Sequence, residues 1–179
     1  STAEFSRLDY ILKNKKGSNI GIVQLYSSLL LYNNIDYELL ITSNRYFNRF
    51  DPDFFNPDNL REILFYIPEI KKYIIPDKKE YRVGEAPFNV LGNYGIYIDK
   101  NKDYYFSTII ENDKKYSTIN RTINVDFKKM KEAVISETQE FTGHWAITNR
   151  AMLNLSNNLT SDEFKDYLTT SGIKGKKII

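Results

Sequence analysis

Residues 20–32 form an almost continuous apolar run that contains no charged side chain. Lys15, Lys16 and Gly17 end the segment before it, and Ser18 or Asn19 can cap a helix that runs to about residue 33. A helix that is apolar on nearly every side is normally buried in the middle of a domain. We therefore expect the first part of the chain to fold around this helix.

The segments on either side of the run predict a mixture of helices and strands. Residues 4–14 place apolar side chains at helical spacing, which predicts a short amphipathic helix. Downstream of the run, the pattern predicts a strand at 37–42, a long irregular loop at 43–59 and a hairpin with strands at 61–67 and 72–75.

The pattern changes after Gly92, where strand-like stretches alternate with short polar turns. This alternation predicts an antiparallel meander, with strands at 95–99, 104–110, 116–127 and 130–141. The end of the chain turns helical: one helix is predicted at 144–155, and a capping box at 160–163 predicts a second at 164–168. We expect an α+β fold with two domains, 1–98 and 99–179.

Composition excludes several classes of function. The chain of 179 residues has 25 basic and 23 acidic side chains, a net charge of +2, which argues against a nucleic-acid partner. No apolar run approaches the length of a membrane span, and no signal peptide is visible. The absence of cysteine excludes disulfides and thiol nucleophiles. A single histidine excludes a His-rich metal site, and we expect neither metal nor cofactor.

Three stretches, at residues 16–19, 60–68 and 72–77, together with the order of the elements, resemble the core of transglutaminase-like domains. The likeness is closest to bacterial versions, common in Bacteroidetes, that carry a β-rich module before and after the core. Residues 88–95 and 140–150 resemble the exit from that core and a later strand-to-helix passage. The resemblance implies a papain/transglutaminase-like core of helices and a small antiparallel sheet. An antiparallel β-rich module with C-terminal helices follows it.

The family's catalytic positions are not retained in this sequence. The cysteine position falls on Asn19, the histidine position on Glu62 and the aspartate position on Ile75, which Asp77 follows closely. In the family, the histidine accepts the thiol proton and the aspartate orients the histidine. The resemblance therefore implies an inactive domain that serves in binding or assembly of a larger secreted or periplasmic bacterial protein. Its expected partner is a protein, a peptide or a glycan.

Two of these positions have a structural and a functional interpretation. Ser18 is either a helix cap or a substitute nucleophile, and the lack of a nearby base favours the cap. Glu62 is either a strand residue paired with Arg61 or Lys72, which we favour, or a general base. The alternative function is a hydrolase of different mechanism that uses Glu62 and Asp77 in the same cleft.

The 43–59 loop is rich in aromatic and basic residues, among them Arg45, Tyr46, Phe47 and Arg49. Long loops on a scaffold often carry function. The loop either lines a groove for a sugar, peptide or anion, or packs its own rings over the core. Elsewhere, His144 and Trp145 are interpreted as structural, with the tryptophan buried at a module junction.

Overall fold

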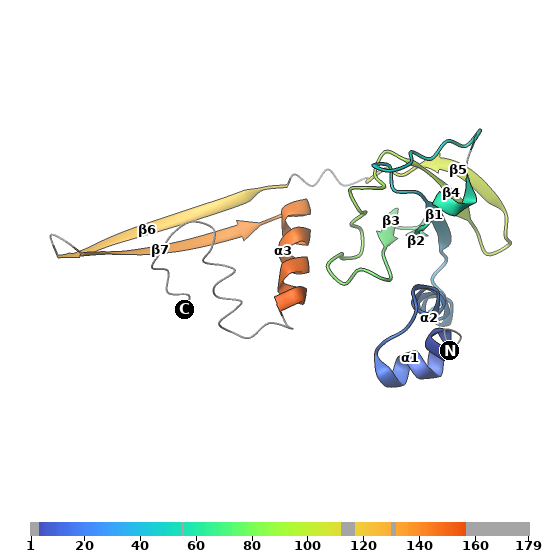
Figure 1. The fold of residues 1–179 in the computed structure, drawn as a ribbon, viewed down its shortest axis with the longest axis horizontal. Helices are drawn as coiled ribbons and strands as arrows, with labels where there is room; N and C mark the ends of the chain where they lie inside the picture. Colours follow the sequence, from blue (N-terminus) through green and yellow to red (C-terminus); the bar gives the residue numbers. More distant parts are fainter. Residues whose placement is uncertain (1–3, 55, 112–116, 130–131, 157–179) are drawn as a thin grey trace. The chain divides into compact units, whose positions relative to one another are not determined.

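The computed structural model describes residues 4–54, 56–111, 117–129 and 132–156 (Figure 1). The chain divides into two compact units, residues 1–114 and 115–179. The described residues contain three α-helices, a five-stranded antiparallel sheet and a two-stranded sheet. The predicted α+β class is therefore confirmed.

The first unit is built on the five-stranded sheet, with the order β3-β2-β1-β4-β5. Each strand is antiparallel to its neighbours. All five strands lie within a few residues of their predicted positions: β1 (Glu38–Thr42), β2 (Glu62–Ile67), β3 (Lys72–Ile74), β4 (Tyr94–Ile98) and β5 (Tyr104–Thr108). A short 3-10 helix, η2 (Pro57–Asn59), lies within the predicted loop.

The division between the units differs from the predicted boundary. Strand β4 pairs with β1, with Leu40 opposite Tyr97, and β5 pairs with β4. A boundary between residues 98 and 99 would separate two paired strands, so the predicted meander is split between two sheets. The Leu40 side chain can pack directly against the backbone of β4 because residue 95 is glycine. A Cβ at this position would lie 2.3 Å from Leu40 Cδ1.

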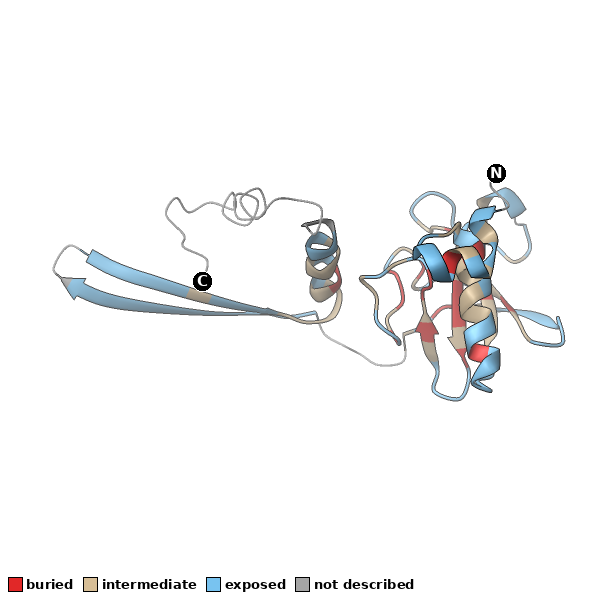
Figure 2. Ribbon diagram, turned by 90° about the horizontal axis from the view of Figure 1, so that it is seen from below, coloured by how far each residue is buried: buried red, intermediate tan, exposed pale blue. Residues whose placement is uncertain are grey.

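Helix α2 (Asn19–Tyr32) covers one face of this sheet. It follows η1 (Glu4–Ser6) and α1 (Leu8–Asn14), and its Leu30 packs in a buried cluster with Phe65 and Ile67. The expectation that the apolar run is buried all round is wrong. Tyr32 is 86% exposed and Ile20 is also exposed, because α2 has the sheet on one side only (Figure 2).

The opposite face of the sheet is covered by the loops that follow β3. Side chains of β2 alternate between the two faces, and both sets are apolar because both faces are covered. The cluster on this second face contains Leu40, Leu64, Tyr73, Ile75, Ala86, Val90, Tyr97 and Ile109. Ala86 and Val90 come from the connection between β3 and β4, which therefore acts as the second covering layer.

Four tyrosines form a row across this second face. Tyr73 lies opposite Tyr66, and Tyr97 lies opposite Tyr105. The Tyr66 and Tyr97 rings meet edge to face at 5.5 Å, which joins the two pairs. At one end the Tyr105 hydroxyl donates to Glu38 at 2.7 Å. Burial raises the pKa of Tyr97, and burial together with the Glu38 hydrogen bond raises the pKa of Tyr105.

The raised pKa values predict a loss of stability in alkali. Above pH ~10, the ordinary pKa of tyrosine, phenols of the unfolded chain ionise while Tyr97 and Tyr105 stay protonated in the folded chain. The contribution of these two phenols to the free energy of unfolding is complete below the ordinary pKa of tyrosine. It is lost as the pH rises through the pKa that they have in the folded chain. Urea unfolding at a series of alkaline pH values should show this fall, and Tyr97→Phe should make it shallower. An equal slope for both proteins would contradict the assignment.

The second unit consists of a hairpin and a helix. Strands β6 (Ile119–Lys129) and β7 (Glu132–Phe141) pair along their length, and α3 (Gly143–Ser156) follows. The helix agrees with the prediction of 144–155. Gly143 has φ +55°, and the Ser117 hydroxyl accepts the His144 N–H at 3.0 Å. Trp145 is half-exposed rather than buried as predicted. The predicted helix at 164–168 lies outside the described residues.

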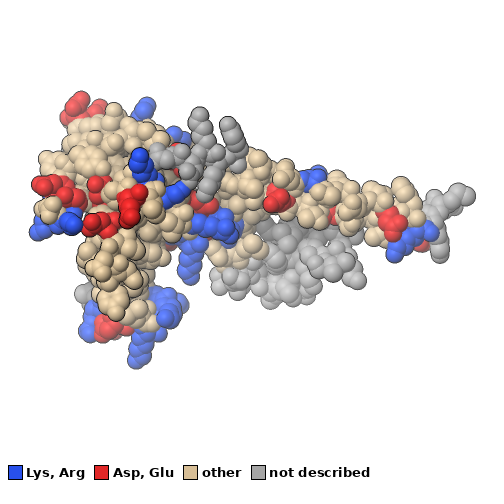
Figure 3. Space-filling view, turned by 180° about the vertical axis from the view of Figure 1, so that it is seen from behind, with Lys and Arg blue, Asp and Glu red and all other residues tan. Residues whose placement is uncertain are grey.

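The surface charge of the described chain is mixed, and its helices are short. On the face shown in Figure 3, acidic and basic side chains are interspersed, as the near-equal numbers of the two kinds suggest. In the part of the chain that the structure describes, no helix has both the length and the apolar character needed to cross a bilayer.

Candidate functional site

The start of α2 is a capped helix end. The Ser18 hydroxyl accepts the Gly21 N–H at 3.1 Å and lies 2.6 Å from the Ser6 hydroxyl. This confirms Ser18 as the helix cap, and it explains why the helix starts here, since the cap satisfies a backbone donor that the helix itself leaves unpaired. Asn19, at the expected nucleophile position, is exposed.

Glu62 is held in a half-buried polar network at the start of β2. Its carboxylate lies 3.0 Å from Lys78 Nζ and accepts from Asn89 Nδ2 at 3.1 Å. The side chains of Glu62 and Lys78 are 21% and 29% exposed. Burial alone would lower the pKa of Lys78, but its hydrogen bond with Glu62 and the attraction of that carboxylate raise it overall. The positive charge of Lys78 therefore balances the negative charge of the Glu62 carboxylate.

This network was predicted only in part. A structural ion pair was favoured for Glu62, but its cation is Lys78 rather than Arg61 or Lys72. Lys78 and Asn89 lie in the connection between β3 and β4, where no periodic pattern or motif points to Glu62. The sequence around Lys78 and Asn89 therefore carries no signal that pairs them with Glu62.

The third expected position lies in the apolar core. Ile75 is 7% exposed and belongs to the cluster that contains Leu40 and Val90, whereas Asp77 is exposed. In the described segments, no hydrogen bond or ion pair joins Asn19 to Glu62, and no group of three acidic or histidine side chains could hold a metal ion. The three positions do not form one connected set of side chains.

Arg45 organises the exposed part of the aromatic loop. Its guanidinium lies 5.2 Å from the centre of the Tyr46 ring and 4.8 Å from that of Phe88, and Nη1 donates to the Leu91 carbonyl at 2.5 Å. The two rings are near-parallel, with centroids 6.3 Å apart and planes at 24°. Tyr46 is 61% and Phe88 54% exposed. We call Arg45, Tyr46 and Phe88 the aromatic platform.

The aromatic platform adjoins the Glu62 network. The Arg45 N–H donates to the Asn89 carbonyl at 3.0 Å, while the side chain of the same asparagine donates to Glu62. Of the other predicted loop residues, Phe47 and Arg49 are exposed, whereas Phe50 is buried and packs against Phe106. Some rings of the loop therefore cover the core, as the packing interpretation predicts, and others face outward.

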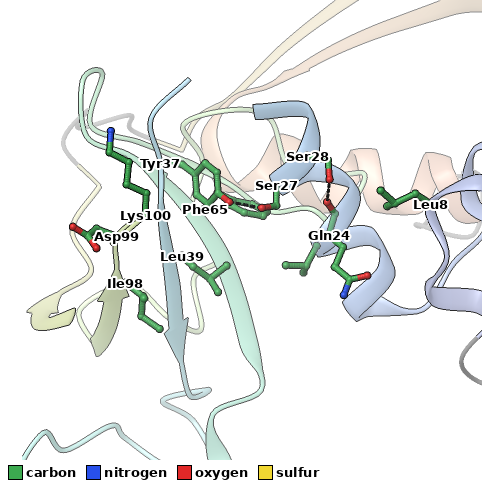
Figure 4. Close-up of a pocket in the computed structure, with 11 residues that line it drawn as sticks. Leu8, Gln24, Ser27, Ser28, Tyr37, Leu39, Phe65, Ile98, Asp99 and Lys100 are labelled. Atoms are coloured by element: carbon green, nitrogen blue, oxygen red, sulfur yellow. Dashed lines mark hydrogen bonds between the residues drawn. The ribbon is translucent and has the colours of Figure 1, made fainter. Parts of the chain in front are cut away.

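A separate groove of about 520 Å³ lies between α2 and the sheet (Figure 4). Its lining is Leu8, Val23, Gln24, Ser27, Ser28, Tyr37, Leu39, Phe65, Ile98, Asp99 and Lys100. Most of its polar groups already have partners: Ser27 bonds Tyr37, Ser28 donates to the Gln24 carbonyl, and Lys100 pairs with Asp36. The lining includes neither Asn19, Glu62 nor the loop aromatics, so it is not the expected cleft.

Comparison of the chain with protein-family models, with curated proteins and with solved structures gave no significant match.

Proposed function

We propose that residues 1–114 form a non-catalytic binding domain, with a degenerate transglutaminase-like fold, that holds a glycan on the aromatic platform. The domain would serve within a larger secreted or periplasmic bacterial protein. The observation that carries the proposal is the stack of Tyr46 and Phe88 on Arg45, two exposed rings held near-parallel by a cation with its own anchor.

The surroundings of Glu62 favour a binding role over catalysis. A general base must accept a proton, but this carboxylate pairs with Lys78 and accepts from Asn89. The alternative of a hydrolase that uses Glu62 and Asp77 finds less support, because Asp77 is exposed and the Glu62 carboxylate is paired with Lys78.

The geometry of the platform favours a sugar ring as ligand. The faces of aromatic rings are electron-rich, and the C–H groups on one side of a pyranose are weakly electropositive, so the two surfaces attract and exclude water. Two near-parallel rings offer a rigid surface at little entropic cost, because Arg45 already fixes them. The Asn89 amide and the Glu62 carboxylate, next to the platform, can bond hydroxyl groups, since a carboxylate has acceptor capacity beyond two bonds.

The test is calorimetric titration of the full chain with cello-, xylo- and chito-oligosaccharides. We expect one of these probes to bind, and Tyr46→Ala to weaken its affinity about tenfold, the effect of losing one stacked ring. The matched control is Phe54→Ala, which removes an exposed ring of the same loop outside the platform and should leave affinity unchanged.

Three results would contradict the proposal. The first is no binding of any probe, and the second is equal affinity for the wild type and Tyr46→Ala. The third is release of ammonia or transfer of an acyl group from an amide or thioester donor by the purified chain, which would show catalysis.

A further inference from the structure

The hairpin of the second unit has one apolar and one polar face. Residues paired across an antiparallel ladder share a face, and the register places Val125 opposite Ile135 and Phe127 opposite Ala133. With Ile119, Ile123 and Phe141 these residues form what we call the apolar hairpin face, on which the polar side chains of Arg121, Glu137 and Gln139 also lie. The other face carries Asn120, Thr122, Asn124, Asp126, Ser136, Thr138 and Glu140, together with the apolar Val134.

Most of the apolar hairpin face is exposed. Phe127 is 78% and Ile135 65% exposed, and Ile119, Ile123 and Val125 are also exposed (Figure 2). Helix α3 contacts β7, from which it continues, and its Ile147 is buried. A two-stranded hairpin is at best marginally stable in water unless it packs against a further element. The half of the hairpin farther from α3 therefore needs a covering surface.

We propose that a second copy of this chain covers the apolar hairpin face, so that the protein is a two-fold dimer through its second unit. The pairing of Phe127 with Ala133 supports a second copy as the partner, because a large side chain beside a small one forms a projection next to a gap on the same face. A two-fold axis along the hairpin puts each β6 over β7 of the other copy. Phe127 then fills the space above Ala133 of the partner subunit, and Val125 lies on Ile135 of the partner subunit.

Area and charge agree with such an interface. From the exposed fractions of Ile123, Val125, Phe127 and Ile135, each copy offers roughly 500 Å², so a dimer would bury about 1,000 Å² in total, the minimum expected of a specific interface. The part of the face formed by Val125, Phe127, Ala133 and Ile135 contains no charged side chain, whereas Glu137 lies directly opposite Ile123. The Arg121–Glu137 ion pair, at 2.9 Å, lies closer to α3 and is already neutralised.

Charge disfavours the alternative in which the hairpins pair edge to edge. Two β7 strands that paired antiparallel about Ser136 would place Glu132 opposite Glu140 of the other copy, and like charges directly opposite each other are destabilising. Packing of the apolar faces avoids this contact and also removes apolar surface from water.

Sedimentation analysis of the full chain over a range of concentrations tests the proposal. We expect a monomer–dimer equilibrium that Ile135→Lys weakens at least about a hundredfold, since it puts two unpaired charges into the interface. The matched control is Ser136→Lys, the next residue on the opposite face, which should dimerise like the wild type. Fluorescence of Trp145 checks that the second unit is folded in each variant.

A charge-swap mixture tests the alignment. Val125→Glu and Ile135→Lys should each be monomeric alone, and an equimolar mixture should regain dimers, because the two new charges meet only between unlike copies.

Since the chain lacks cysteine, Phe127→Cys mixed with Ala133→Cys offers a second test with a short thiol cross-linker, which should join the two proteins. A wild-type monomer at all concentrations would overturn the proposal, as would a dimer that Ile135→Lys leaves intact or one that Ser136→Lys also breaks. Capture of a different protein by a monomeric chain would equally overturn it.

Discussion

Replacement of Phe65 by alanine is expected to destabilise the first unit by about 3–5 kcal/mol, the range for removal of a buried phenylalanine. Phe65 is fully buried in β2, beneath α2. Its ring meets Tyr37 edge to face at 5.1 Å and lies 6.4 Å from Tyr26 in a stacked arrangement. The substitution removes the main contact between the helix and the sheet and leaves a cavity that neither rigid element can close.

Urea unfolding followed by the near-ultraviolet circular dichroism of tyrosine measures this loss. Nearly all tyrosines belong to the first unit, whereas the single tryptophan, Trp145, belongs to the second. Tryptophan fluorescence should therefore keep its wild-type midpoint in Phe65→Ala. Phe54→Ala removes an exposed ring and should change stability by less than about 0.5 kcal/mol. A loss below about 1 kcal/mol for Phe65→Ala would show that α2 is not held by this contact.

A second large loss is expected from Asn93→Ala, about 2–4 kcal/mol for two buried polar groups that lose their partners. Asn93 is fully buried just before β4. Its Oδ1 accepts the Phe50 N–H at 2.9 Å, and its Nδ2 donates to the Ser43 carbonyl at 3.0 Å. One side chain thus ties both ends of the 43–50 segment to the sheet, and this segment carries two members of the aromatic platform.

Two measurements on Asn93→Ala separate stability from loop order. Urea unfolding gives the free energy, and hydrogen exchange of the Phe50 amide should accelerate beyond the change in global stability, since that amide loses its acceptor. The matched control is Asn48→Ala, an exposed asparagine of the same loop, which should leave both quantities near wild type. Unchanged exchange at Phe50 would contradict the assigned role.

Most secondary structure was predictable, because its signals are local. The Ser18 cap lies three residues from the amide whose hydrogen bond it accepts, and the hairpin of β2 and β3 follows from two strand-like apolar runs around a turn at Pro68. Such signals act within one turn of helix or one reversal of chain, so a single sequence contains them. The predicted strands at 104–110 and 130–141 were placed for the same reason.

The errors concern contacts between distant segments. The sequence did not reveal that β4 joins β1, since an alternating strand fits the edge of any sheet with an apolar face. Apolar residues of α2 were expected to be buried, but burial depends on how many elements surround the helix. The partners of the predicted residues are also distant in sequence: Lys78 and Asn89 bind Glu62, and Phe88 packs on Arg45.

Local periodicity, capping and turn residues determined the α+β class and nearly every element of the described chain from the sequence alone. The tertiary structure alone decided the strand order, the end of the first unit at residue 114, the ion pair of Glu62 and the stack of Arg45 on two rings. The physical reason is that a helix or turn is selected by neighbours a few residues away. A strand partner, a buried asparagine network or an ion pair is selected instead by the competition of all segments for the same surface, which no local pattern records.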